Sequence, residues 1–352
     1  MLQRNFGLDL LRCIAIIGVV AVHIADGRAL YCFAAVVPVD LFFSLSGFLI
    51  AQMMVERFDG ISTPAAFWAF MANRWLRTLP LYFLALSTYL GFLVILAPQP
   101  VDIASIFTRY ALFIQYIPWY HDSEAWQSTF FTVSWSLAIE EWFYLLCPLV
   151  LLLAGARSRR FFIGLIGILV MTSITYRLAV CLADPAMTQS IIFKSTPTRA
   201  DAFVFGIGAY FTVRGGLGKR LSLACCAAGL LLATVNAWMI PAVTLGLYTK
   251  ALTPSLAPLS MALLIPAALT LKAPQAIARA AAWLSTRTYA IYLFHTLVIA
   301  FAFPPGQHTA FRLLAFVVAT GLLADFLYRY VERPFMRLRP VRAPSAIPAL
   351  AE

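Results

Sequence analysis

The chain has 352 residues, of which 62% are hydrophobic and only 12% are charged, and its formal net charge is +11. A water-soluble protein of this length needs a charged exterior, so the composition excludes a soluble multidomain protein and favours a surface that faces lipid. Because the basic residues gather in particular connections, we do not interpret the positive charge as a nucleic-acid-binding surface.

Apolar residues recur in about ten runs of roughly 17 to 25 residues, each able to cross about 30 Å of hydrocarbon as a helix. We therefore expect an all-α polytopic membrane helix bundle. Residues 1–339 would form one integral membrane domain, and residues 340–352 a short cytoplasmic tail without regular structure. The predicted spans lie near residues 8–25, 34–54, 79–97, 133–153, 161–182, 199–213, 221–240, 256–272, 288–303 and 310–330.

The distribution of basic residues predicts how the chain is oriented. With the N-terminus inside, roughly eighteen basic residues fall in inner connections and about five in outer ones. By the positive-inside rule, both termini are then cytoplasmic and the number of spans is even. Asp9 and Arg12 interrupt the first run and no small-residue cleavage site follows, so we expect a retained span in the inner (plasma) membrane rather than a signal peptide.

The first predicted span carries three ionisable side chains, Asp9, Arg12 and His23. Eleven residues of helix turn about 1100°, some 20° past three full turns, and rise about 16 Å. Arg12 and His23 therefore share one face, with Arg12 near the cytoplasmic mouth. The alternative is that Arg12 is an anchor paired with Asp9 and that His23 is an interfacial histidine.

The second predicted span opens with Asp40 and continues through Ser44, Ser46 and Gly47. An acidic side chain inside a bilayer is costly and is kept mostly where it pairs or acts, so Asp40 is a candidate cavity residue. The small residues that follow favour close approach of a neighbouring helix.

Residues 63–78 mix Trp68 and Trp75 with Arg74 and Arg77. Aromatic and basic residues in this mixture are typical of a helix lying in the headgroup layer, so we expect an interfacial helix before the third span. In the long outer connection, residues 103–117 are apolar but too few to cross a membrane, which predicts a short re-entrant or interfacial helix.

The fourth predicted span places two adjacent carboxylates, Glu140 and Glu141, near its outer end. Ser136, Glu140 and Tyr144 follow one another at intervals of four residues and so form a stripe on one face. We expect one of the carboxylates to face His23. The alternative is a structural hydrogen bond between helices.

Three further polar residues occur at similar depth, namely Arg199 and Asp201 at the start of the sixth span and His295 within the ninth. Together with Asp40 they predict a polar cavity, although Arg199 and Asp201 could instead cap a span at the interface. The six cysteines lack the spacing of metal ligands, so we expect them in the core and predict neither a metal nor a permanently bound cofactor.

A buried histidine beside a carboxylate is a suitable general base, and acyl transfer to a hydroxyl needs one. Transfer also needs a place for an activated donor, and Arg12 is positioned to meet a phosphorylated donor that enters from the cytoplasm. The separation of about 16 Å between Arg12 and His23 is comparable to the reach of a pantetheine arm.

At these residues the chain resembles acyltransferase family 3, the polytopic membrane acyltransferases of surface polysaccharides, nodulation factors, peptidoglycan and some antibiotics. The likeness covers nearly the whole chain and is carried by GLDLLRCIAIIGVVAVH, VDLFFSLSGFLIA, RWLRTLPLYF, WSLAIEEWFY, TRADAFVFG, STRTYAIYLFH and YVERPF, in that order.

The resemblance implies roles for particular residues. Arg12 and His23 match the family's essential pair, and Glu140 and Glu141 match its paired glutamates. Acetyl-CoA or another acyl-CoA is the implied donor, for which Arg74 and Arg77 are further candidate ligands. Trp142 departs from the family pattern, where a polar residue is common, and no hydrolase-like domain follows the last span, which implies the stand-alone form.

The sequence therefore predicts an O-acyltransferase embedded in the lipid bilayer, most simply an O-acetyltransferase, that acts on a sugar, glycolipid or polysaccharide and has no nucleic-acid partner. Two alternatives remain. A proton-coupled transporter or flippase would also use membrane histidines and glutamates. A non-catalytic partner of a polysaccharide assembly complex would tolerate loss of His23 and of both glutamates.

Overall fold

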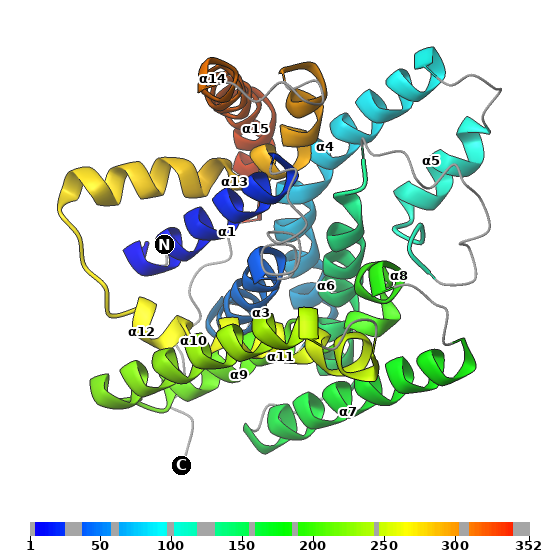
Figure 1. Ribbon diagram of the computed structural model, residues 1–352. Helices are drawn as coiled ribbons and strands as arrows, with labels where there is room; N and C mark the ends of the chain where they lie inside the picture. Colours follow the sequence, from blue (N-terminus) through cyan, green and yellow to red (C-terminus); the bar gives the residue numbers. More distant parts are fainter. Residues whose placement is uncertain are drawn as a thin grey trace.

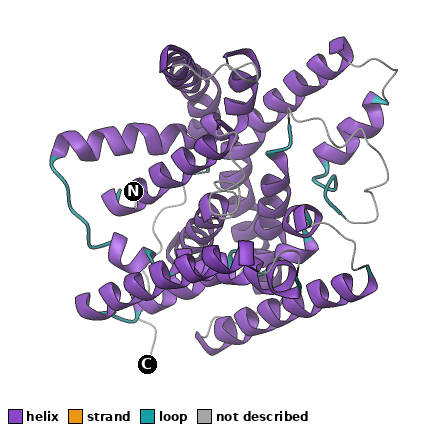
Figure 2. Cartoon of the chain, viewed as in Figure 1, coloured by secondary structure: helices purple, strands orange, loops and turns teal. Residues whose placement is uncertain are grey.

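The computed structural model describes residues 4–24, 37–57, 63–96, 102–117, 131–154, 159–184, 189–242, 246–302 and 310–340. In this part of the chain every regular element is helical (Figure 2). The all-α prediction is therefore confirmed. The predicted unstructured tail lies outside the described residues, apart from Pro340.

The helices follow one another along the chain as a bundle around a central α3 and α6 (Figure 1). In chain order they are α1 (Phe6–Ile24), α3 (Val37–Arg57), α4 (Pro64–Leu96), α5 (Ile103–Ala111), α6 (Ser134–Ala154), α7 (Arg159–Ala183), α8 (Gln189–Lys194), η4 (Pro197–Arg199), α9 (Val204–Arg214), α10 (Lys219–Ala242), η5 (Tyr248–Leu252), α11 (Thr253–Ala262), α12 (Ile265–Ala268), α13 (Gln275–Ala302), α14 (Ala310–Leu327), η6 (Tyr328–Glu332) and α15 (Arg333–Arg337).

Eight of the described helical segments are long and apolar enough to cross a membrane, compared with the ten predicted spans. The two that differ are α9, which has only 11 residues, and α13, a helix of 28 residues that is not among the eight. A helix needs about 20 residues to cross a bilayer, so α9 is too short to span one alone. Which side of the membrane holds the termini stays a prediction.

The prediction of a separate interfacial helix at residues 63–78 is wrong. These residues are the first half of α4, one continuous helix of 33 residues that passes through Pro80. Phe70 and Met71 are fully buried in the core. Proline is tolerated inside a membrane helix where neighbouring groups satisfy the freed backbone carbonyl.

The helices α3 and α9 touch backbone to backbone, as the small residues of the second span predicted. A Cβ atom added at Gly206 would lie 2.0 Å from the carbonyl oxygen of Ser44, and one added at Gly47 would lie 2.0 Å from that of Phe203. Only glycine permits this approach. By contrast, α7, α10 and α14 have only 17%, 22% and 22% of their residues buried, which places them at the lipid-facing periphery (Figure 1).

Candidate active site

Helices α1, α3, α4, α6 and α13 enclose a cavity of about 110 Å³, which we call the arginine cavity. Its walls are partly apolar, with Phe42 and Leu49 among them. The polar side chains that line it are Arg12, Ser46, Arg74, Arg77, Thr78, Ser136, Glu140, Thr288, Tyr289 and Tyr292. The three arginines predicted to contact a donor therefore do converge on one space.

The arginine cavity carries an excess of positive charge, because three guanidinium groups face one carboxylate. Arg74 lies 3.7 Å from Glu140 and stacks 3.9 Å above the ring centre of Tyr144. Its buried Nε has no partner among the described residues. Of the predicted stripe, Ser136 and Glu140 line the cavity, whereas Tyr144 does not line it and packs its ring against Arg74.

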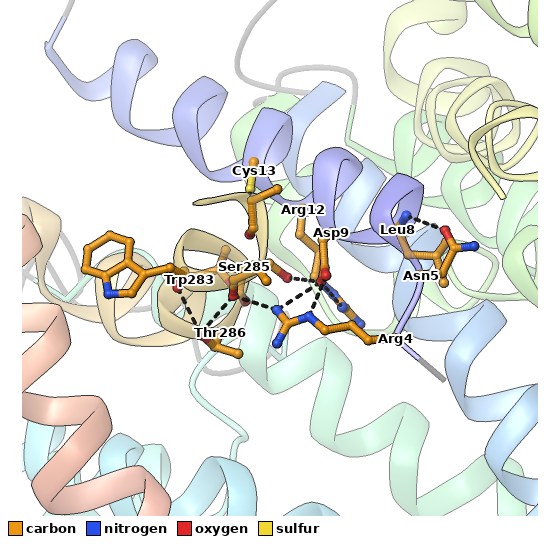
Figure 3. Close-up of polar contacts among 12 residues, drawn as sticks. Arg4, Asn5, Leu8, Asp9, Arg12, Cys13, Trp283, Ser285 and Thr286 are labelled. Carbon is orange, nitrogen blue, oxygen red and sulfur yellow. Dashed lines mark hydrogen bonds and ion pairs between the residues drawn. The ribbon is translucent and has the colours of Figure 1, made fainter. Parts of the chain in front are cut away.

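Asp9 is held mainly by groups other than Arg12. Its carboxylate accepts hydrogen bonds from Arg4 Nε at 2.5 Å and from Ser285 Oγ at 2.7 Å, as Figure 3 shows. Arg12 Nη1 is 3.5 Å away, beyond the usual 2.7–3.2 Å of a strong N–H···O bond. Arg12 thus keeps the ion pair with Asp9 that the alternative predicted, and its side chain also lines the arginine cavity.

The expectation that Glu140 or Glu141 faces His23 is not met. Glu140 accepts a hydrogen bond from Ser46 Oγ at 2.8 Å, and Glu141 accepts one from Thr78 Oγ1 at 2.8 Å. Buried carboxylates require donors, and both find them on α3 and α4. Neither has a hydrogen bond or ion pair with His23, whose side chain lies at the end of α1.

His23 instead contacts His295, which α13 brings beside α1. His295 is fully buried, whereas the His23 side chain is exposed. Nδ1 of His23 is 3.4 Å from Nε2 of His295, and the two rings meet edge to face with their centres 4.8 Å apart. His295, which the sequence predicted as a cavity residue, therefore lies beside His23 where a carboxylate was expected.

The backbone fixes which nitrogens of this histidine pair carry protons. Nδ1 of His23 lies 2.8 Å from the carbonyl oxygen of Val19, and Nδ1 of His295 lies 2.9 Å from that of Tyr292. A carbonyl only accepts, so both Nδ1 atoms are donors. The lone pair on Nε2 of His295 then faces the N–H of His23, which leaves Nε2 of His23 as a basic nitrogen.

Tyr292 connects the arginine cavity to the histidine pair, and the sequence did not indicate it. Its ring lines the cavity and lies 6.2 Å, centre to centre, from the ring of His295. Its hydroxyl donates to the carbonyl of Val133 at 3.0 Å and lies 2.6 Å from Ser136 Oγ. The spacing of Tyr292 and His295, one helical turn apart, was the available signal.

Lys194, at the end of α8, is close enough to His23 to interact with it electrostatically. Burial lowers the pKa of its ammonium group from the usual value of a lysine. Several outer residues that could contact a sugar, but that we interpret as solvated loop residues, lie outside the described residues; they are Arg28, Trp119, His121, Asp122, Glu124 and Trp126.

Comparison with known proteins places the chain in a family. The sequence profile of an acyltransferase domain family, acyltransferase family 3, matches residues 5–328. The chain belongs to acyltransferase family 3. No solved structure matches it.

Curated relatives of this acyltransferase family 3 chain are O-acetyltransferases by name. It is 24% identical to O-acetyltransferase OatA of Staphylococcus aureus (strain NCTC 8325 / PS 47), over 94% of the chain and 57% of the relative. It is 28% identical to the putative peptidoglycan O-acetyltransferase YrhL of Bacillus subtilis (strain 168), over 93% of the chain and 54% of the relative. The chain thus spans little more than half the length of these relatives.

In this acyltransferase family 3 chain, Asp40, Arg199 and Asp201 do not join the arginine cavity. Asp40 forms a buried ion pair with Arg199, which also donates to the carbonyl of Pro254 at 3.0 Å. Asp201 pairs with Arg177 at 3.0 Å. This network ties α3, α7, η4 and α11 together, so these residues do not form one continuous polar cavity with Arg12 and Glu140.

Arg177 is the residue of this network that the sequence interpretation missed. Its side chain is fully buried, and it donates to Asp201 and to the carbonyl of Ala251 at 2.8 Å. The signal was present, because Arg177 stands alone within the apolar run of α7. An isolated cation at that depth is expected to have an acidic partner.

Proposed function

We propose that the chain is an integral membrane O-acyltransferase, most simply an O-acetyltransferase, that moves an acyl group from acyl-CoA to a hydroxyl of a sugar, glycolipid or polysaccharide. One observation carries the proposal, namely that Tyr292, which lines the arginine cavity, packs beside His295, which in turn contacts His23. The names of the curated relatives support the same class of reaction.

The donor end is assigned to Arg12, Arg74 and Arg77. Guanidinium groups bind phosphates through paired N–H donors, and each keeps its charge in an apolar surrounding. The three guanidinium groups outnumber the single carboxylate of Glu140, so the cavity is positively charged. A positive cavity favours binding of a phosphorylated donor. The thioester would then extend along the cavity toward Tyr292.

The chemical step is assigned to Nε2 of His23. In direct transfer this nitrogen takes the proton of the acceptor hydroxyl, the oxygen attacks the thioester carbonyl, and the C–S bond breaks. The CoA thiolate then takes the proton from the imidazolium, so the products are the ester and free CoA thiol. In the alternative, Nε2 of His23 carries the acyl group before the hydroxyl receives it.

Acyl transfer is tested with the purified full chain in lipid nanodiscs, acetyl-CoA carrying a labelled acetyl group, and peptidoglycan or cell-surface glycan fragments as acceptors. We expect CoA thiol release together with label in the glycan. His23→Ala should lower both by about 10² to 10⁴, the usual contribution of a general base. Gly208→Ala is the control, because the added Cβ would lie an ordinary 3.7 Å from Ile166.

Wild-type transfer by His23→Ala would overturn the site assignment. Movement of a glycan precursor across the membrane without release of CoA thiol would favour a transporter and overturn the proposed function.

A further inference from the structure

A second, larger cavity of about 360 Å³ lies between α6, α7, η4 and α9. We call it the apolar cavity. Its size falls within the range of small-molecule pockets. Among its lining residues Arg199 alone is charged, and the walls are otherwise almost entirely hydrocarbon, from residues such as Ile139, Leu146, Leu169 and Val204.

The apolar cavity opens toward the lipid-facing surface. Leu146 and Val150, which line it from α6, are 48% and 39% exposed, and the opposite wall belongs to α7, a peripheral helix (Figure 1). Apolar side chains exposed on the outside of a membrane helix contact hydrocarbon rather than water. The molecules that can enter from the open side are therefore the lipids of the bilayer.

Aromatic rings separate the apolar cavity from the arginine cavity. Phe203 lines the apolar cavity and lies 4.3 Å, centre to centre, from Phe143. It also lies 4.7 Å from Phe43, which lines the arginine cavity. Rings at these separations are in direct contact. The apolar cavity is therefore a site of its own, divided by packed side chains from the place assigned to the acyl donor.

The apolar cavity follows α6 over about the depth of one leaflet. Ile139 and Val150, the first and last residues of α6 that line it, are eleven residues apart, which is about 16 Å along a helix. Half of a hydrocarbon core of about 30 Å is about 15 Å. The length of the cavity between α6 and α7 therefore matches that of one lipid acyl chain.

Buried polar atoms without a partner lie at one end of the apolar cavity. Nε of Arg199 and Oγ1 of Thr196 have no hydrogen-bond partner among the described residues, and both side chains line the cavity. Thr196 is held near the start of α6, because its backbone N–H donates to the carbonyl of Tyr116 at 3.2 Å. The carbonyl of Phe113, close by in the same segment, accepts from Nε1 of Trp142 on α6 at 3.0 Å. Buried donors are normally paired, so a ligand that fills the cavity is expected to bring an acceptor to this end.

The acceptor that suits Arg199 carries no charge. The side chain is 1% exposed, its charge is balanced by the buried carboxylate of Asp40, and its Nη1 donates to the carbonyl of Pro254 at 3.0 Å. A carboxylate or phosphate in the cavity would place a second, uncompensated negative charge beside Asp40. An ester carbonyl is neutral, accepts hydrogen bonds and stands at the head of each acyl chain of a glycerolipid.

We infer that the apolar cavity binds one acyl chain of a glycerophospholipid of the bilayer, and that the ester carbonyl of this chain accepts hydrogen bonds from Arg199 Nε and Thr196 Oγ1. With the start of α6 on the outer side, as the positive-inside rule predicts, the lipid belongs to the outer leaflet. The bound chain joins α7, of which only 17% is buried, to α6 and η4. The inference does not depend on the proposed acyl transfer.

Native mass spectrometry of the full chain in detergent tests the inference, with titration of dioleoyl phosphatidylcholine and of its diether analogue, which lacks the ester carbonyls. We expect a single tightly bound ester lipid per chain. The ether lipid should bind about threefold to tenfold more weakly, as expected for the loss of a hydrogen bond. Thr196→Val removes the hydroxyl, keeps the branched shape of the side chain and should reduce the preference for the ester lipid.

Leu169→Trp narrows the apolar cavity and should weaken the tight lipid by about tenfold, equivalent to losing the burial of about two methylenes. Ile168→Trp is the matched control, since this neighbour on α7 is 64% exposed and does not line the cavity. It should bind lipid as the wild type does. Absence of a tightly bound lipid, equal affinity of the wild type for ester and ether lipids, or equal loss in the two tryptophan variants would overturn the inference.

Discussion

His295 occupies the place that a carboxylate was expected to take beside His23. Its Nε2 lies 3.4 Å from Nδ1 of His23, whose proton is shared with the nearer carbonyl of Val19, while its own Nδ1–H is held by the backbone of α13. A neutral partner orients the ring of His23 without placing a negative charge next to it. In this arrangement His23 keeps a defined tautomer in a site that contains no neighbouring acid among the described residues.

Replacing His295 should disturb the tautomer of His23. In His295→Ala we expect transfer to fall by about tenfold to a hundredfold, less than for loss of the base itself. The distinguishing measurement is ¹⁵N NMR of labelled His23, which should show a protonated Nδ1 in the wild type and a tautomer mixture in the variant. An unchanged His23 spectrum together with lost activity would assign His295 to packing instead.

Glu141 is predicted to support the site through α4 rather than to act on the substrate. In Glu141→Leu the hydroxyl of Thr78 loses the carboxylate acceptor at 2.8 Å and keeps only the carbonyl of Arg74 at 3.3 Å, so stability should fall by about 1–3 kcal/mol. Glu141→Gln retains an acceptor oxygen and is the control. Unfolding in mixed detergent measures both variants, and near wild-type stability of Glu141→Leu would contradict this role.

At the scale of helices, the contact between α3 and α9 positions Ser46 against Glu140. Both glycines of this contact would clash if they carried a Cβ. We expect Gly206→Ala to lower the thermal midpoint of the detergent-solubilised protein and to reduce transfer. Gly208→Ala, two residues along α9, has room and should fold at least as well. Equal behaviour of the two variants would be evidence against the close packing.

The helices could be predicted from the sequence where they depend only on the length of a continuous run of apolar residues. Within the described residues, each of the ten predicted apolar segments is mainly helical, because a long apolar run in lipid satisfies its backbone only as a helix. The sequence did not predict that residues 63–78 continue into the third span as one helix. Arg74 and Arg77 have the composition of headgroup anchors, and only the packing of α1 and α6 against α4 shows that they face a cavity. Local composition does not distinguish a guanidinium that faces headgroups from one that faces a cavity.

The sequence predicted which residues belong to the candidate site better than it predicted which of them contact one another. The sequence identified Arg12, His23 and His295 because charged and polar groups within apolar runs are conspicuous. It assigned the wrong partner to His23, since the choice between α6 and α13 depends on how helices distant in sequence pack. Arg177 and Tyr292 were missed although each had a local signal, namely an isolated cation in the apolar run of α7 and a position one turn from His295.

At the scale of the whole molecule, the ion pair of Arg177 and Asp201 joins α7 to the centre of the bundle. Arg177→Met leaves Asp201 buried without its partner and should cost about 3–5 kcal/mol, seen as poor accumulation in the membrane. The double change Arg177→Met with Asp201→Leu removes both charges and should recover part of the loss. Greater loss in the double variant than in the single one would contradict this account.

The orientation of the bundle is also testable. By the positive-inside rule the connection between α9 and α10 is cytoplasmic and the end of α7 is external. In a background without native cysteines, an impermeant maleimide added to intact cells should label Ala183→Cys and spare Gly218→Cys until the cells are opened. The reverse pattern would invert the predicted topology and with it the side from which acyl-CoA enters.

The central claim is that Arg12 binds the donor and that His23 carries out the chemical step. It is tested most directly by equilibrium binding of acetyl-CoA to the purified wild type, Arg12→Ala and His23→Ala. We predict that Arg12→Ala weakens binding by about tenfold to a hundredfold, as expected for the loss of a charged hydrogen-bond donor. His23→Ala should bind as the wild type does while failing to transfer. Wild-type affinity in Arg12→Ala would contradict the assignment of the arginine cavity to the donor.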